Sequence, residues 1–514
     1  MFLWLQRVSP WCGAAVIMMT SINVVTAAVS AGQGYSFRGV QALQVKPNPI
    51  AEELGQKLKQ FEAQWRDRSV RATLTMAIEQ SLLHNPDLAQ AYSQIQQSQW
   101  NLIAVRRQWY PFLSASSAGP AVGLLGYRGS STHTSRSTAT GTVEQNSTTN
   151  QAGFGPVLSM GWTFFDPSRS SQINAASESL RSQELLFNVA ARNLVLQTQL
   201  AYFNLQEQQR LIAAYEQILA ATTNQARQTE ALFNIGNASI ADVEKIRTQQ
   251  FQTLSLLIAA HLAVIDASAS LARAMALPPG KLVLPEDQLD LYGRWDLSLD
   301  VTIQQAQRLR EEIQSSLAQA NSAKWLATSL FNRYWPRFSL VANGFYAYAD
   351  RRDNVARISN SERLRSSSLD GAVGLGFNWS IFDGGIAAAE AEANKALALQ
   401  LSDRAAAQRL QISQEVEQSY ASYNSSRMAL LSSREQAESA RKATIAVRER
   451  FNVGYADTTS VVQTLDQAIT AANAYARSQR EYNSAVATLY RASAHWPEST
   501  LALRDQRVNE LKRR

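Results

Sequence analysis

The sequence predicts a mainly α-helical chain that also contributes strands to a transmembrane β-barrel. Three observations support this prediction: an internal duplication, two long stretches without a helix breaker, and short tryptophan-rich segments in which apolar and polar residues alternate. Each half of the chain is expected to hold a helix, a β-hairpin, a very long helix, a glycine turn and a second helix. The chain would therefore contain two long antiparallel helical hairpins and two β-hairpins.

The duplication is visible when the sequence is compared with itself. Residues 74–114 match residues 299–339 without a gap, at an offset of 225. Further matches follow at offsets of 217 and 218: Trp162-Thr163-Phe164-Phe165-Asp166 with Trp379-Ser380-Ile381-Phe382-Asp383, and Phe233-Asn234-Ile235-Gly236 with Phe451-Asn452-Val453-Gly454. We interpret the chain as a tandem repeat.

The long helices are predicted from the absence of helix breakers. Neither Gly nor Pro occurs in residues 168–235 or 386–453, and each stretch is 68 residues long. A helix of that length spans about 100 Å, which no globular domain encloses, so an extended coiled-coil assembly is expected. In the first stretch the apolar residues recur every seven positions: Leu205, Ile212, Leu219, Ala226 and Phe233.

A single glycine follows each long stretch. Gly236 and Gly454 are expected to end the helices in the left-handed conformation that glycine adopts at little cost. The breaker-free residues 237–277 and 455–496 would then run back along the first helices.

Strands are predicted between the short and long helices of each half. Leu158, Met160, Trp162 and Phe164 alternate with small or polar residues, as do Val373, Leu375, Phe377, Trp379 and Ile381. Such strands fit a half-buried sheet or a membrane barrel with a wet lumen. Aromatic residues near the strand ends favour the barrel: Trp109, Tyr110, Trp162, Phe165, Trp335, Trp379 and Phe382. Residues 129–152 and the arginine-rich 351–368 are interpreted as hairpin loops. Four strands cannot close a barrel, so two, three or four chains would pool their strands.

The N-terminus is predicted to be a signal peptide, residues 1–31. Arg7 precedes an apolar stretch that ends in the small-residue pattern Val29-Ser30-Ala31. An N-terminal membrane anchor is the alternative, because the apolar stretch approaches the length of a span. The only cysteine, Cys12, lies in this segment. We therefore expect an exported protein whose mature chain has no thiol and no lipid anchor.

Composition and motifs argue against several other functions. Charged residues are 18% of the 514, against about 25% in a typical soluble domain, and the net charge of +7 includes no dense Lys/Arg run. Nucleic-acid binding is therefore not expected. No catalytic residues, cofactor or metal site are predicted, because there is no phosphate-binding loop and no metal-spaced pair among the four histidines: His84, His133, His261 and His495. We expect the chain not to be an enzyme.

These features together resemble the TolC-like outer-membrane efflux proteins. The resemblance covers residues 70–497 and is carried by the duplicated plan, the Trp-x-x-Phe-Asp strand ends, both Phe-Asn-x-Gly turns, and Ala77-Ile78-Glu79-Gln80-Ser81-Leu82 leading to Asn85-Pro86-Asp87-Leu88. It implies a homotrimer with a 12-stranded barrel in the outer membrane and a periplasmic helical tunnel. It also implies a periplasmic adaptor protein and, indirectly, an inner-membrane pump (ABC or proton-driven) as partners. Small molecules or polypeptides would leave through the channel passively, in efflux or in type I secretion.

The resemblance also implies roles for residues at the glycine turns. The periplasmic tip, where the adaptor would dock, falls on Phe233, Asn234, Gly236, Phe451, Asn452 and Gly454. The gate, or tunnel constriction, falls on Asp242, Asp457, Ser460 and Gln463. Well-known members close the tip by bonding an acidic residue to a Tyr and an Arg. Here the acid is Asp242, but its partners fall on Phe451 and Ala456, and the two tunnel acids fall on Ser460 and Gln463. We therefore expect a more neutral, less cation-selective gate.

On this basis the chain is divided into six segments: 1–31, signal peptide; 32–73, N-terminal periplasmic segment; 74–278, first repeat, with its β-hairpin at about 111–166; 279–298, linker; 299–497, second repeat, with its β-hairpin at about 336–383; and 498–514, C-terminal tail. A soluble periplasmic coiled-coil protein is the alternative, although it would not explain the tryptophan-rich strands. The sequence does not separate drug efflux from protein secretion, nor identify the pump.

Overall fold

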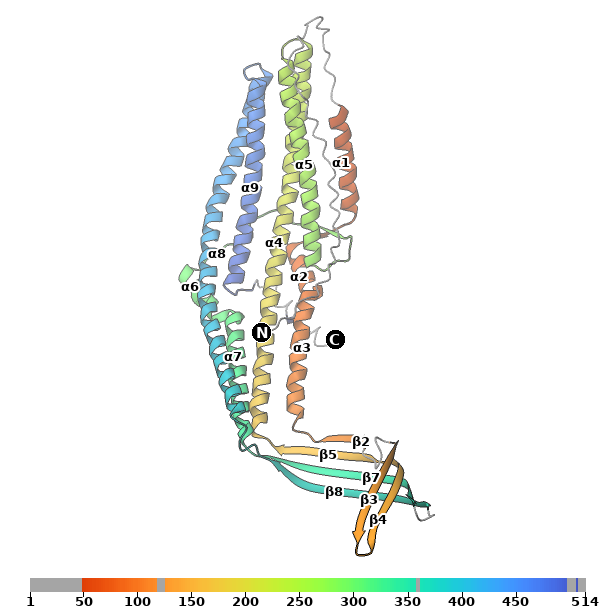
Figure 1. Cartoon of the computed structure of the whole chain (residues 1–514). Helices are drawn as coiled ribbons and strands as arrows, with labels where there is room; N and C mark the ends of the chain where they lie inside the picture. The colour runs from red at the N-terminus through yellow and green to blue at the C-terminus, as the bar shows by residue number, and fades with distance from the viewer. Residues whose placement is uncertain (1–48, 118–124, 357–360, 497–504, 507–514) are drawn as a thin grey trace, which may run out of the picture. The chain divides into compact units, whose positions relative to one another are not determined.

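The computed structural model describes residues 49–117, 125–356, 361–496 and 505–506, all within one compact unit, Pro47–Arg514. The predicted signal peptide and nearly all of the predicted C-terminal tail lie outside the described residues. Two sets of elements follow one another along the chain (Figure 1). The first set is α1 (Pro49–Asp67), β1 (Ser69–Ala72), α2 (Leu74–His84), α3 (Pro86–Arg107), β2 (Phe112–Ser117), β3 (Leu125–Thr138), β4 (Gly141–Phe154), β5 (Pro156–Phe165), α4 (Pro167–Asn234), α5 (Ile240–Ala274) and β6 (Leu282–Pro285). The second set is α6 (Leu299–Leu309), α7 (Glu311–Phe331), η1 (Asn332–Tyr334), β7 (Arg337–Ala356), β8 (Ser361–Asn378), α8 (Ile386–Asn452) and α9 (Thr458–Ala492).

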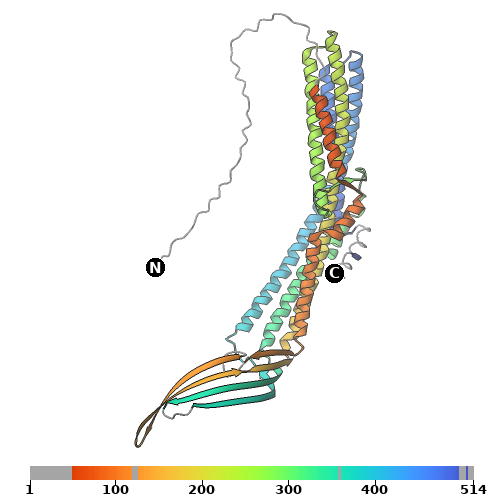
Figure 2. The ribbon, with the colours of Figure 1, turned by 90° about the vertical axis from the view of Figure 1, so that its right-hand side faces the viewer.

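The two long helices are as the sequence predicts. Helix α4 has 68 residues and α8 has 67. Each packs against the helix that follows it, α5 and α9 respectively, and α4 also packs against α9 and α7 (Figure 2). The two antiparallel hairpins thus form one helical bundle.

The short helix of each half is interrupted, which the sequence analysis did not predict. Asn85 separates α2 from α3, because Pro86 disfavours a helical conformation in the residue before it. The Asn85 amide donates to the carbonyl oxygen of Ala274 at 3.0 Å, which ties this break to the end of α5. In the second half Arg310 has an extended backbone without any neighbouring proline, and its buried guanidinium binds Glu312 and Glu415.

The six longer strands form one antiparallel sheet in the order β2-β5-β7-β4-β3, with β8 paired to the free side of β7. Two interpretations of the sequence are corrected here. Residues 129–152 are not a loop but belong to β3 and β4, which pair along their whole length. Strands β7 and β8 likewise extend into the segment 351–368. Their polar composition reflects the exposure of the strands, because threonine and serine are compatible with an extended, solvated backbone.

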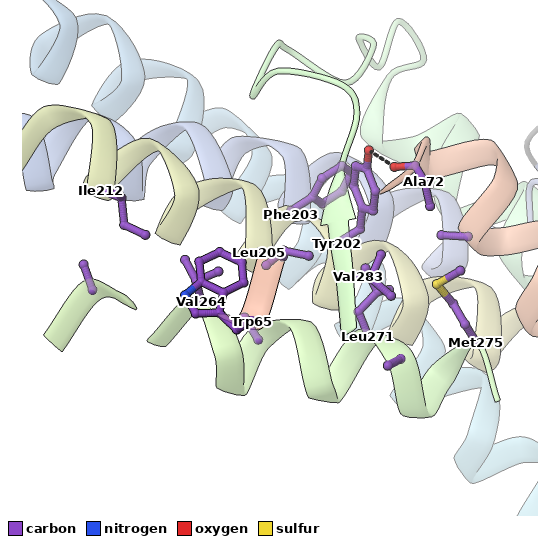
Figure 3. Close-up of a cluster of buried hydrophobic side chains, with 14 of the residues drawn as sticks. Trp65, Ala72, Tyr202, Phe203, Leu205, Ile212, Val264, Leu271, Met275 and Val283 are labelled. Atoms are coloured by element: carbon purple, nitrogen blue, oxygen red, sulfur yellow. Dashed lines mark hydrogen bonds between the residues drawn. The ribbon is translucent and has the colours of Figure 1, made fainter. Parts of the chain in front are cut away.

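A smaller parallel pair, β1 with β6, lies beside the largest buried cluster (Figure 3). Tyr202 of α4 is 1% exposed, and its hydroxyl donates to the carbonyl oxygen of Ala72 and lies 3.0 Å from Asp287 Oδ2. The space between α4, α5 and β6 is filled by the ring of Tyr202 and the side chains of Leu271 and Val283. The expected linker 279–298 therefore packs onto the bundle through β6 and the residues that follow.

Among the described helices, α5 is the one that is long and apolar enough to cross a membrane. In its most apolar 18-residue window, 44% of the residues are buried. Val243, Ile246, Val264 and Leu271 are completely buried in the bundle. Packing against α4 and β6 therefore explains much of its apolar character.

Candidate functional site

The residues assigned to the tip and the gate lie where the two helical hairpins turn. We call residues 233–242 and 451–463 the turn end. Since α4 begins two residues after β5, and α8 begins eight residues after β8, the turn end is separated from the sheet by the full length of the long helices. The structure brings both glycine turns to this end of the bundle (Figure 1).

Both glycines adopt the left-handed conformation, with φ of 82° at Gly236 and at Gly454. The amide of Gly236 donates to Phe233, and that of Asn237 donates to Leu232 at 2.8 Å. The second turn repeats this pattern: the Gly454 amide donates to Phe451, and the next amide donates to the carbonyl oxygen of Arg450. Each turn is a helix end with two satisfied carbonyl groups.

Replacing Gly454 with alanine should lower the free energy of unfolding by about 1–2 kcal/mol, because an L-residue is strained in the left-handed region. No atom lies within 4 Å of the position that the alanine Cβ would occupy, so steric contact adds nothing. Gly55, in the middle of α1 and equally open, is the control: its replacement with alanine should stabilise the helix. Urea denaturation followed by helical circular dichroism measures both. Equal effects of the same sign would contradict the argument.

The equivalent phenylalanines of the two turns have different environments. Phe451 is 8% exposed and packs in a cluster with Ala226, Ile246, Val461 and Leu465, which joins the two hairpins. Phe233 is only half-buried, and Asn234 is exposed. The side chain of Asn452 accepts a hydrogen bond from Gln228 of α4 at 3.0 Å. The duplication in sequence therefore does not give duplicated contacts.

Three exposed apolar side chains at the turns were missed by the sequence analysis. Ile235, Val453 and Tyr455 are 70%, 67% and 78% exposed. The sequence signal was available, since each is an apolar residue next to the turn glycine in a solvent-facing bend. They add an apolar surface to the tip residues named above.

The two acidic gate residues bond to helix N-termini. Asp242 accepts hydrogen bonds from the amide and hydroxyl of Ser239, at 3.1 and 2.6 Å, while Ser239 caps α5. The hydroxyl of Ser239 is the main reason that the pKa of Asp242 lies below its usual value. Asp457 caps α9 and accepts from the amide and hydroxyl of Ser460, and these bonds lower its pKa as well. Gln463 is exposed.

Polar contacts join the N-terminal parts of α5 and α9. Lys245 Nζ lies 3.0 Å from the hydroxyl of Thr459, and Gln249 donates to Asp466 at 2.7 Å. From the sequence alone, Asp466 is only a carboxylate near the gate residues. Its bond to Gln249 places it at the contact between the two hairpins.

At the sheet end, the Trp-x-x-Phe-Asp motifs connect strand to helix in the same way in both halves. The indole of Trp162 donates to the carbonyl oxygen of Trp109, and that of Trp379 donates to Tyr334, both at 2.9 Å. Asp166 caps α4, and Asp383 accepts from the amides of Gly385 and Ala387 at the start of α8. The motif fixes the corner between sheet and helix.

One face of the sheet is apolar and exposed. Along β8, Leu369, Val373, Leu375 and Phe377 point to one side and are 70–82% exposed. Small residues alternate with them. An exposed apolar face of this extent marks a membrane or protein contact, and the flanking tryptophans are typical of a membrane interface.

The turn end combines polar helix caps with exposed apolar side chains. Among the described residues, the only group of His, Asp and Glu side chains spaced to hold a metal ion is Glu62, Glu216 and His261, which lies elsewhere. Sequence spacing does not indicate this group, because its members come from three different helices.

Comparison with known proteins agrees with this arrangement. The sequence model of the outer membrane efflux proteins matches residues 77–277 and 302–495. No curated protein sequence matches the chain.

Among solved structures, the outer-membrane channel OprN is 20% identical, with a TM-score of 0.61, over 82% of this chain and 90% of its own. The Campylobacter jejuni CmeC outer membrane channel is 14% identical, with a TM-score of 0.63, over 84% and 89%. The open state of the Neisseria gonorrhoeae MtrE outer membrane channel is 15% identical, with a TM-score of 0.60, over 82% and 89%. These likenesses show the fold.

The family match covers both repeats and confirms the resemblance found in the sequence. The solved structures confirm the predicted fold class, mainly helical with long hairpins and antiparallel strands. The chain therefore belongs to the outer membrane efflux protein family: it is a non-enzymatic efflux channel of the outer membrane with a helical periplasmic extension.

Proposed function

We propose that the channel is a homotrimer, the exit duct through which small molecules or polypeptides pass passively from an inner-membrane pump and a periplasmic adaptor protein. The open sheet supports an assembly of several copies, and the resemblance to the family implies that their number is three. Within the described strands, β2 pairs only with β5, and β8 pairs only with β7. An unpaired strand edge is not tolerated in lipid, so copies of the chain must satisfy these edges.

The mass of the full protein extracted from outer membranes in mild detergent tests this proposal. We expect three times the mass of the processed chain. A monomer or dimer recovered from the soluble periplasm would overturn it and favour the soluble coiled-coil alternative.

The adaptor would dock at the turn end. Phe233, Asn234, Gly236, Phe451, Asn452 and Gly454 are the residues assigned to this contact, and the exposed side chains of Ile235, Val453 and Tyr455 extend it. Apolar and aromatic side chains in a polar surround are typical of protein interfaces. The buried position of Phe451 limits its part to shaping the turn.

The gate would be more neutral than one with carboxylates at positions 460 and 463, because Ser460 and Gln463 carry no charge. The hydrogen bonds of Asp242 and Asp457 favour their charged forms, but the positive dipole end of the helix at which each lies offsets part of that charge. A ring of carboxylates attracts cations, whereas serine and glutamine do not.

We therefore expect weak block of single-channel current by trivalent cations in the natural channel. Gln463→Glu should strengthen the block at least about tenfold, because a trimer would gain a ring of three carboxylates. Gln97→Glu, an exposed position on α3 away from the turns, is the control and should leave the block unchanged. Strong block of the natural channel that persists in both Asp457→Asn and Asp466→Asn would contradict a neutral gate.

A further inference from the structure

We propose that Glu62 of α1, Glu216 of α4 and His261 of α5 form a binding site for one divalent transition-metal ion of the Zn²⁺ class. The site is separate from the turns and from the sheet, and it adds a function that efflux itself does not require. Its predicted effect is to hold α1 on the hairpin of α4 and α5.

The three side chains converge although they are far apart in sequence. One ligand atom from each lies within 4.8 Å of the other two. Tetrahedral zinc bound at about 2.0–2.2 Å needs ligand atoms about 3.3–3.6 Å apart. Glu216 is exposed, so rotation of its side chain closes the remaining distance.

His261 gives the strongest indication of a ligand site. The residue is 1% exposed, and its Nδ1 is buried without a hydrogen-bond partner among the described residues. A buried polar atom without a partner costs about 1–3 kcal/mol, and a protein tolerates it where a ligand or water satisfies the group. The neutral form of imidazole has a nitrogen lone pair that can bind a metal ion.

A cavity lies beside these groups. Its volume is about 510 Å³, and its lining includes all three proposed ligands together with Leu58, Leu219 and Leu254. Apolar walls around a small polar centre are typical of metal sites, since they strengthen the bonds to the ion. The space is sufficient for the ion and for water in the remaining coordination positions.

The nearby charges permit one dication. Arg66 binds Glu62 Oε1 at 2.5 Å, which leaves the other carboxylate oxygen for the metal. Lys59 also lines the cavity. These two cations weaken the attraction of the two carboxylates for a dication, so binding would also require the bond to the imidazole nitrogen of His261.

The ligand set selects the class of metal. One imidazole nitrogen and two carboxylates suit Zn²⁺, Co²⁺ or Ni²⁺, whereas Ca²⁺ and Mg²⁺ prefer oxygen ligands only. Because each ligand belongs to a different helix, the ion would join α1 to α4 and α5. Trp65, whose ring lies 6.2 Å from that of His261, already packs α1 at this point.

Equilibrium dialysis of the full-length protein against Zn²⁺, followed by metal analysis, tests the site. The protein should be purified with a tag that contains no histidine. We expect one Zn²⁺ per chain, and Glu216→Gln should weaken binding by at least about tenfold, since even outer-shell partners of metal ligands contribute 10–100-fold. Glu216 is exposed, so this substitution is compatible with folding. Glu184→Gln, also exposed and on α4, is the matched control and should bind like the natural protein.

Hydrogen exchange provides a second readout. At a Zn²⁺ concentration about 100 times the Kd, amides of α1 should exchange up to about 100-fold more slowly, and this protection should be lost in Glu216→Gln. Equal Zn²⁺ binding by Glu216→Gln and the natural protein would overturn the proposal. Binding without protection of α1 would overturn the joining role.

Discussion

Replacing Arg310 with methionine should lower the free energy of unfolding by about 1.5–3 kcal/mol, because the partly buried carboxylates of Glu312 and Glu415 lose the charged hydrogen bonds of a buried guanidinium. Arg310 is 3% exposed and binds Glu312, at 2.7 Å, and Glu415. Arg491 binds the same two carboxylates, and Arg192, 5% exposed, pairs with Glu311 and Glu312. This charged cluster joins α4, α7, α8 and α9 where the short helix of the second repeat is broken.

Urea denaturation followed by helical circular dichroism measures the effect. Arg441→Met is the control, since Arg441 is 63% exposed in its pair with Glu438 and its loss should not change the unfolding midpoint measurably. Similar midpoints for the two variants would contradict the assigned importance of burial.

The same cluster predicts a loss of stability in acid. Burial alone raises the pKa of Glu312, but the bonds from Arg310 outweigh it and hold the pKa below its ordinary value of 4.5. A lowered carboxyl pKa stabilises the fold above pH 4.5, and this contribution is lost as the pH falls through the lowered pKa. The difference between the natural protein and Arg310→Met should therefore shrink below pH 4.5.

A disulfide between positions 242 and 456 should stop export. Ala456 packs against the cluster that contains Ile246, which lies one turn along α5 from Asp242, so the bond would join the two hairpins at the turn end. If the channel opens by movement of these hairpins, the joined form stays closed. Cys12 is the only cysteine of the sequence, so a Cys12→Ser background isolates the new pair.

Efflux of a fluorescent substrate from cells measures the effect, before and after reduction. We expect loss of efflux in the oxidised Asp242→Cys/Ala456→Cys protein and recovery on reduction. Each single cysteine variant is a control, and Asp242→Cys alone separates loss of the helix cap from the cross-link. Unchanged efflux in trimers verified as cross-linked would contradict gating at the turns.

The helical part of the fold was predictable because its causes are local. Breaker-free stretches located α4 and α8 to within two residues at each end, and the turn glycines were identified by their position after Phe-Asn-Ile and Phe-Asn-Val. The break at Arg310 was not predictable, because no proline marks it and its partner Glu415 is 105 residues away. The strands in 129–152 were missed because polar residues signal exposure more clearly than they signal backbone conformation.

At the candidate site, too, local features were predictable and contacts between distant residues were not. The sequence located both turns and the acidic residues beside them, but equivalent residues of the two repeats look alike in it. Phe451 is buried and Phe233 is not, because only the second turn meets Ile246 of the other hairpin. The caps formed by Asp242 and Asp457 depend on the local order Ser-x-x-Asp and Asp-x-x-Ser, a signal that the sequence contains.

The sequence by itself determined the duplicated plan, the long helices and the turn glycines, since these follow from composition, periodicity and short motifs, and its motifs resemble those of a channel family. Only the tertiary structure decided which residues meet across elements. The cluster around Arg310, the contact of Gln249 with Asp466 and the convergence of Glu62, Glu216 and His261 each join helices that are distant in the chain. The physical reason is that such contacts depend on how the helices pack, which no local pattern encodes.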